Sequence, residues 1–141
     1  MFIALTDTVA VAGQLVAAEM AAAAAAGFRH IVNNRPDGEE PGQPADVELR
    51  AAAEATALSY TAIPVDHSGI GPAQVDAMAT VLAAATGPLL AFCRSGSRSA
   101  HLWALAAASQ GGDPDAIISA AARARFDVAG LRPAMVRLAA R

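Results

Sequence analysis

The stretch FCRSGSRSA (residues 92–100) combines the only cysteine of the chain with two arginines, one glycine and three serines. A thiolate is a strong nucleophile, and arginine binds anions through a planar fork of N–H donors. A cysteine beside such groups could attack a sulfane sulfur or the phosphorus of a phosphate ester. The stretch therefore predicts an enzyme with Cys93 as catalytic nucleophile, the alternative being a cysteine that only fills the core.

The sequence around Cys93 favours the reactive role. PLLAFC (88–93) is a continuous apolar run, which is typical of a central parallel strand, and it ends at the cysteine. A Gly/Ser loop and a predicted helix follow. The loop N–H groups and the helix N-terminus should point into one concavity, where they would bind an anion and stabilise a thiolate.

The other residues of this loop divide into catalytic and binding roles. Arg98 opens the helix, so its guanidinium is predicted to close the anion site with two parallel hydrogen bonds, and it joins Cys93 as a catalytic residue. Arg94 lies within the loop and is expected at the mouth of the pocket. The serines could cap the helix or donate to the thiolate, and glycine permits the turn. The predicted substrate- or anion-binding residues are Arg94, Ser95, Gly96, Ser97 and Ser99.

Candidates for proton transfer lie outside this loop. Asp66 follows an apolar run and is predicted either as a general acid or as a residue that caps a turn. His101 lies one helical turn beyond Arg98 and could face the rim of the pocket, but helix packing is the expected role. His67 is expected on the surface and His30 in a strand, neither with a chemical role. The histidines and the cysteine share no metal-ligand spacing, so no metal and no cofactor are predicted.

The loop DGEE (37–40) is expected to present solvated carboxylates. Arg35, just before it, could orient this loop, although RPDG (35–38) is a turn sequence by itself.

Helical and extended patterns alternate along the chain, which predicts one α/β domain over residues 1–141. We expect a largely parallel sheet of about four strands with helices on both faces. The strands are predicted over 8–12, 28–34, 59–65 and 88–93, and the helices over 14–26, 45–57, 72–85, 99–109, 113–124 and about 131–140.

Composition excludes several classes of function. The chain has 141 residues, of which 55% are apolar and 16% charged, as in globular proteins. Its net charge of −3 argues against nucleic-acid binding, and the absence of lysine excludes Schiff-base chemistry. No run reads as a membrane span or a signal peptide, so a cytoplasmic location and no membrane partner are expected.

Two families share these motifs. CRSGSR (93–98) resembles the active-site loop of rhodanese-type sulfurtransferases, in which four residues separate cysteine and arginine, whereas protein tyrosine and dual-specificity phosphatases have five. The shorter ring suits a single sulfur better than a phosphoryl group. RHIVNNRPDGE (29–39) and YTAIPVDHSG (60–69) instead resemble the strand-loop and the general-acid loop of dual-specificity phosphatases. The long segment after Cys93 also resembles those enzymes.

Together the motifs are identified as those of the phosphatase-like domain of bacterial β-lactamase hydrolase-like proteins, a group often labelled sulfurtransferase. The resemblance implies a three-layer fold of the dual-specificity-phosphatase type with a rhodanese-length loop, and association with sulfide-oxidising proteins. It makes Cys93 the nucleophile and Arg98 the anion-binding arginine. Phe92 stands where phosphatases often have histidine, which removes one means of activating the thiolate.

Three functions for a small anionic substrate follow, in order of preference. The first is sulfane-sulfur transfer through a persulfide on Cys93. The second is phosphate-ester hydrolysis through a cysteinyl-phosphate, with Asp66 as the acid. The third is an anion-binding module without catalysis.

Overall fold

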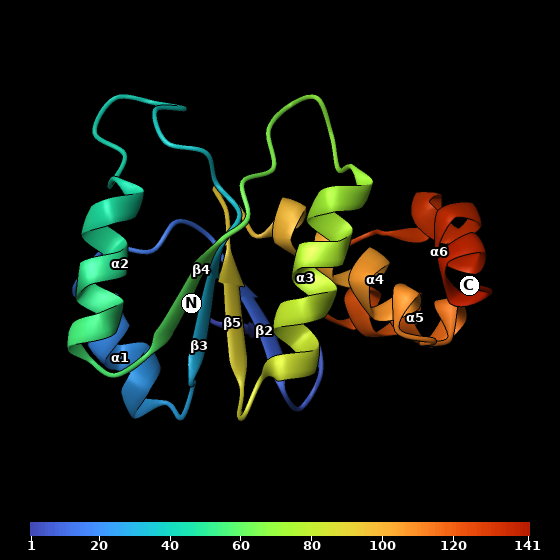
Figure 1. Cartoon of the computed structure of the whole chain (residues 1–141), viewed down its shortest axis with the longest axis horizontal. Coiled ribbons are helices and arrows are strands. Elements are labelled where there is room, and N and C mark those ends of the chain that lie inside the picture. The colour runs from blue at the N-terminus through green and yellow to red at the C-terminus, as the bar shows by residue number, and fades with distance from the viewer.

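Five strands form one mostly parallel sheet in the computed structural model, which describes residues 1–141. The strand order is β1-β2-β5-β3-β4, and only the edge pair β1–β2 is antiparallel (Figure 1). The predicted four-strand parallel sheet is therefore confirmed, with one short strand added. The strands are β1 Ile3–Ala4, β2 Val9–Ala12, β3 His30–Asn33, β4 Ser59–Ala62 and β5 Leu89–Phe92.

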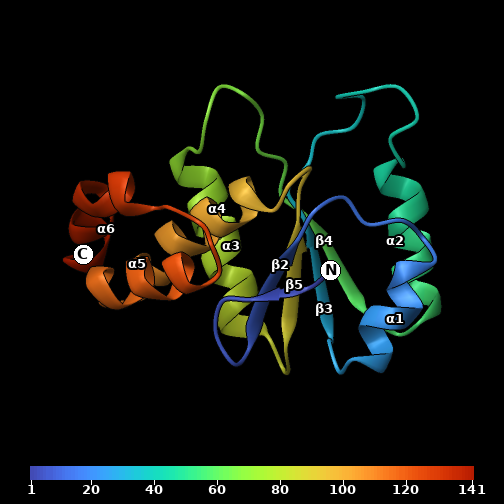
Figure 2. The same ribbon diagram turned by 180° about the vertical axis from the view of Figure 1, so that it is seen from behind.

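Helices cover both faces of this sheet and make three layers (Figures 1 and 2). Two helices lie on one face, and the other four lie on the opposite face. None of them has both the length and the apolar character that a membrane crossing requires. The helices are α1 Glu19–Ala25, α2 Asp46–Ala55, α3 Pro72–Ala84, α4 Ser97–Ser109, α5 Pro114–Arg123 and α6 Arg132–Ala139, and a 3₁₀ turn, η1, spans Ala129–Leu131.

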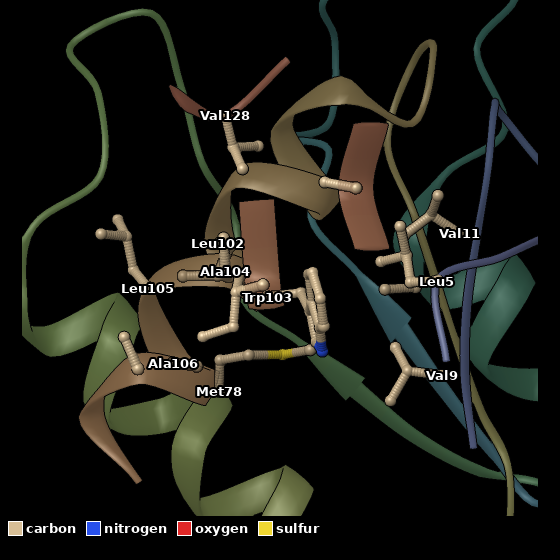
Figure 3. Close-up of a cluster of buried hydrophobic side chains, with 14 of the residues drawn as sticks. Leu5, Val9, Val11, Met78, Leu102, Trp103, Ala104, Leu105, Ala106 and Val128 are labelled. Atoms are coloured by element: carbon tan, nitrogen blue, oxygen red, sulfur yellow. The ribbon is translucent and has the colours of Figure 1, made fainter. Parts of the chain in front are cut away.

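The central strand β5 is buried on both faces, as its apolar run predicts. Leu89 and Ala91 belong to the larger core cluster, on the side of α3 and α4, whereas Leu90 and Phe92 belong to the smaller cluster beneath α1 and α2. Figure 3 shows part of the larger cluster, where side chains of α4 meet those of β2. Packing on both faces fixes the end of β5, and with it the position of Cys93.

The prediction and the structure differ at one helix and at one strand. The helix expected over 14–26 begins only at Glu19, because Gln14 N donates to Arg94 O (3.1 Å) and Glu19 Oε1 accepts from Val16 N (3.0 Å). The first contact holds Gln14 against the loop of Cys93, and the second caps the later helix start, since a glutamate in the first turn accepts from a backbone N–H that has no partner within the helix. The two-residue strand β1 is absent from the sequence-based prediction, since so short a segment has no recognisable periodicity.

The parallel strands bring their carboxyl ends to one edge of the sheet. The segments after β3 and β4 rise above this edge (Figure 1, top), and the loop between β5 and α4 lies at the same edge. Ligands of open α/β sheets usually bind outside the carboxyl ends of the strands. The candidate residues named from the sequence come from these segments.

Candidate active site

The loop that carries Cys93 is held in a defined shape by backbone hydrogen bonds. Cys93 follows β5 directly and is 0% exposed, and its Sγ accepts a hydrogen bond from Gly96 N at 3.1 Å. Cys93 N donates to Ala12 O (3.4 Å), which ties the loop to the end of β2. The thiol is thus buried, yet it accepts a hydrogen bond from a loop amide, a group that can stabilise its anion.

Gly96 makes the turn that leads from this loop into α4. Its φ is +94°, a conformation that L side chains rarely adopt. A Cβ at this position would lie 3.2 Å from Phe126 Cζ and 3.4 Å from Ala12 O. The sequence-based reason for this glycine, a turn that a Cβ would hinder, agrees with this geometry.

Replacing Gly96 with alanine should lower the free energy of unfolding by about 1–2 kcal/mol, the usual cost of a left-handed backbone for an L residue. Urea unfolding would measure it. Gly130→Ala is the matched control, because Gly130 has no positive φ and a Cβ added there would meet no atom within 4 Å. Equal effects of the two substitutions would contradict the strain argument.

Arg98 binds a carboxylate of the chain itself. Its Nη1 and Nη2 each donate to one oxygen of Glu39, both at 2.8 Å, and Nη1 also donates to Val65 O at 2.7 Å. A guanidinium has five N–H donors, so Nε–H and one N–H of Nη2 remain on the other edge of the plane. Hydrogen bonding and charge from Glu39 raise the pKa of Arg98, and Cys93 adds to this effect. The remaining edge of the fork is therefore the one available to a substrate anion beside the thiol.

Glu39 is shared between two arginines, so the expectation of a solvated DGEE loop is wrong for this residue. Its side chain is 14% exposed, and its Oε1 accepts from Arg35 Nε at 2.8 Å as well as from Arg98. Arg35 is buried and also donates to Gln14 Oε1 (2.9 Å) and to the outer carboxylate Glu40 (3.0 Å). The predicted role of Arg35 in orienting this loop agrees with these contacts.

The two arginines hold the pKa of Glu39 at about 2, because the hydrogen bond from Arg98, and then that from Arg35, outweigh the opposing effect of burial. Glu39→Gln should therefore destabilise the fold by about 3 kcal/mol at neutral pH, since breaking one side of a buried ion pair leaves uncompensated charge. Chemical unfolding at pH 7 would measure the loss, with the exposed Glu48→Gln as control.

The same ion pairs predict a pH dependence. A lowered carboxyl pKa contributes stability above the ordinary value of 4.5, and this contribution disappears as the pH falls from about 4.5 to about 2. The difference in unfolding free energy between parent and Glu39→Gln should shrink across this range. A difference that stays constant from pH 7 to pH 2 would contradict the assignment.

Asp66 lies in the exposed segment after β4, beside the site but turned to its own loop. Its carboxylate accepts from Ser68 N (2.8 Å) and from the Ser68 hydroxyl. These two bonds lower the pKa of Asp66. The structure thus shows the turn-capping arrangement, one of the two expectations for this residue.

A pocket of about 430 Å³ lies between the Asp66 segment, the start of α4 and α6. Its polar lining includes Asp66, Ser97, Arg98 and His101. His101 is half-buried, and its Nδ1 donates to Ser97 O at 2.7 Å. Helix packing is the preferred expectation for His101 and the pocket rim the alternative, and the structure places its side chain in the same pocket as Arg98.

The serines of the loop differ in where they lie. Ser99 is 0% exposed, and its hydroxyl donates to Asn34 Oδ1 at 2.8 Å. Asn34 in turn donates from its side chain to Ile63 O (2.9 Å) and from its backbone to Phe92 O (2.8 Å). Ser99 therefore holds α4 to the ends of three strands, and a direct contact with an anion is not supported by its burial.

Arg94 and Ser95 are exposed, and Arg94 lies 3.8 Å from the Glu40 carboxylate. Ser97 is half-buried at the pocket. Phe92 is fully buried in the smaller core cluster and offers no polar group to the thiol.

Sequence reasoning missed Asn34 and Glu39 as site residues. Two signals could have identified them. Asn33 and Asn34 continue an apolar strand directly. Two polar residues at such a place are unusual unless their side-chain amides have hydrogen-bond partners within the protein. Glu39 lies four residues after Arg35, a spacing at which the two side chains can pair. Its loop is also expected at the same edge of the sheet as Arg98. No three His, Cys, Asp or Glu side chains lie close enough to hold a metal ion.

Several solved structures share this fold, and some of them carry the name phosphatase. A protein of Neisseria meningitidis strain Z2491 (nma1982), provisionally classed as a phosphatase, is 28% identical with a TM-score of 0.80, and the match covers 96% of each chain. PTPMT1 bound to PI(5)P is 15% identical with a TM-score of 0.73, covering 99% of this chain and 97% of that one. TpbA of P. aeruginosa, in a complex with pTyr, is 21% identical with a TM-score of 0.60, covering 96% and 90%. The predicted dual-specificity-phosphatase type of fold is confirmed.

Sequence relatives give the family. β-Lactamase hydrolase-like proteins of Agrobacterium fabrum and of Xylella fastidiosa (strain Temecula1) are each 38% identical, over 107 and 101 residues, or 76% and 72% of this chain. The matched segment is only 25% and 23% of their own length. The family model for the β-lactamase hydrolase-like protein, phosphatase-like domain, matches residues 1–111 and confirms the family predicted from the motifs. The chain belongs to the phosphatase-like domains of β-lactamase hydrolase-like proteins.

Proposed function

We propose that this domain hydrolyses phosphate monoesters through a cysteinyl-phosphate on Cys93. The family and fold give the coarser statement, a domain of phosphatase type. Two proteins of the same fold have phosphate esters, pTyr and PI(5)P, in their solved complexes. A phosphate ester is therefore the substrate class for which the comparisons offer support.

The reaction would proceed in two displacements. The Cys93 thiolate attacks phosphorus, the bond from phosphorus to the ester oxygen breaks, and the leaving oxygen takes a proton. Water then attacks the phosphoryl group, gives up a proton, and restores the thiolate. The loop amides and the remaining edge of the Arg98 fork would hold the phosphoryl oxygens through both steps.

One observation carries this proposal: Arg98 joins three segments and also lines a pocket. Its bonds to Glu39 and to Val65 O bring the loop after β3 and the segment after β4 against the loop of Cys93. The pocket of about 430 Å³ beside Arg98 leaves room for the organic part of an ester. Thiosulfate, which has no organic part, would leave this space unused.

Sulfane-sulfur transfer is the second candidate, and the length of the loop favours it. Four residues separate Cys93 from Arg98, as in rhodanese-type loops. Here the thiolate would attack the outer sulfur of thiosulfate, sulfite would leave with the bonding pair, and an acceptor thiolate or cyanide would remove the sulfur. The sequence motifs favour sulfur transfer over ester hydrolysis. The family, the fold and the pocket instead support ester hydrolysis as the first candidate.

Side-by-side turnover of phenyl phosphate and of thiosulfate with cyanide would test the proposal. We expect hydrolysis of the ester to exceed sulfur transfer in kcat/KM. Sulfur transfer without measurable ester hydrolysis would favour the second candidate, and neither activity would favour an anion-binding module. The association with sulfide-oxidising proteins and the cytoplasmic location stay predictions.

A further inference from the structure

The hydrogen bond of His101 determines which of its ring nitrogens can carry out proton transfer. Nδ1 lies 2.7 Å from Ser97 O, and a carbonyl oxygen can only accept, so Nδ1 carries hydrogen. Nε2 is left without a protein partner and is the nitrogen that can gain or lose a proton. A histidine oriented through one nitrogen, with the other available, is the usual arrangement of a general acid or base.

The position of His101 places it among groups that bind an anion. It lines the same pocket as Arg98, from the same helix, one turn further along. The half-buried ring is anchored to the backbone of Ser97, the residue next to Arg98. An ester whose phosphoryl group lies on Arg98 would therefore extend its leaving group into the pocket that His101 lines.

Asp66, the other candidate for the acid, is engaged elsewhere. Both hydrogen bonds of its carboxylate go to Ser68, in an exposed turn. The same bonds favour its ionised form, whereas a general acid must carry a proton at the start of the step. Asp66 is a better partner for a nearby cation than a donor to a leaving group.

We propose that His101 is the proton donor to the leaving oxygen of the substrate, an inference that rests on the proposed phosphatase function. In the first displacement Nε2–H of the imidazolium gives its proton to the ester oxygen as the phosphorus–oxygen bond breaks. In the second, the neutral Nε2 accepts a proton from the attacking water as the phosphorus–sulfur bond breaks. The imidazolium and the thiolate are then restored, so protons and bonds balance.

The charged groups that face His101 are few. Asp66, on the segment after β4, is the acidic group that lines the pocket with it, and Arg98, on α4, is the basic one. The elements on the remaining side, η1 and α6, contribute the apolar residues Leu131 and Ala134. The first displacement needs a protonated His101, so kcat/KM for phenyl phosphate should fall as the pH rises.

Two esters with different leaving groups test the inference. His101→Asn keeps an N–H donor toward Ser97 O but has no titratable group. This variant should hydrolyse phenyl phosphate roughly 10²–10⁴-fold more slowly than the parent, which is the usual rate contribution of a general acid. The burst of dinitrophenolate from 2,4-dinitrophenyl phosphate, which reports the first displacement alone, should change by only a few-fold, because this leaving anion needs no proton. The descending limb of kcat/KM at high pH should also disappear.

One control variant and one comparison variant separate failure of the inference from failure of the proposed function. The exposed His67→Asn should leave both esters within a few-fold of the parent, and Asp66→Asn should slow phenyl phosphate hydrolysis far less than His101→Asn does. A large defect in Asp66→Asn on phenyl phosphate, with His101→Asn near the parent, would overturn the inference and leave the phosphatase function standing. A parent that hydrolyses neither ester would overturn the phosphatase function and the inference with it.

A readout without turnover is the nitrogen-15 spectrum of the imidazole rings. The parent should show His101 as the Nδ1–H tautomer at high pH, and added inorganic phosphate should shift its titration. An Nε2–H tautomer, or a titration that phosphate leaves unchanged, would overturn the inference.

Discussion

Replacing Cys93 with serine should lower the hydrolysis of phenyl phosphate by roughly 10⁴-fold or more, because loss of the nucleophile removes the covalent route entirely. The serine hydroxyl occupies a similar volume and can still accept the hydrogen bond from Gly96 N, which Sγ accepts at 3.1 Å. Initial rates at saturating substrate, with enzyme freed of any parent protein, would measure the loss.

Phosphate binding is the control for this substitution. The serine variant should unfold at nearly the same urea concentration as the parent and should bind inorganic phosphate about as well, since the loop amides and Arg98 are unchanged. A variant that keeps a tenth or more of the parent rate would show that Cys93, whose side chain is 0% exposed, only fills the core.

Arg98→Lys should lower kcat/KM for phenyl phosphate by about 10²–10³-fold, the usual loss when a donor to a developing charge is removed. Lysine keeps the charge but cannot bind Glu39 with one edge and the phosphoryl group with the other. In the parent, both Nη atoms lie 2.8 Å from Glu39 oxygens, so the orientation of the fork is set before substrate arrives.

Arg94→Lys is the matched control, because Arg94 is exposed on the same loop and its nearest carboxylate is 3.8 Å away. Its effect should stay within a few-fold. Unfolding measurements on both variants would separate lost binding from lost folding, since Arg98→Lys also weakens the pair with Glu39. Similar kinetic defects in the two variants would contradict the assignment of roles.

Local patterns in the sequence predict the strand, loop and helix around Cys93. An apolar run of six residues ends at the cysteine, and a glycine and a helix follow, so each element can be inferred from neighbouring residues. Burial of β5 on both faces, the positive φ of Gly96 and the position of Arg98 at the start of α4 agree with that prediction.

Contacts between distant segments could not be predicted in this way. Glu39 reads as a solvated loop residue until the fold brings Arg98 to it from 59 positions away. Gln14 reads as the start of a helix, but its backbone is taken by the loop of Cys93. Ser99 reads as an anion ligand, whereas it turns inward to Asn34. In each case a tertiary hydrogen bond outweighed a local preference.

The two candidate functions differ in the group that Cys93 carries between the two displacements. Intact-mass measurement of the parent, acid-quenched within its first turnover with phenyl phosphate, should show the added mass of one phosphoryl group, which Cys93→Ser lacks. After thiosulfate treatment, no added sulfur should appear. A single added sulfur on the parent, absent from the serine variant, together with no phosphorylated protein at any quench time, would contradict the phosphatase proposal.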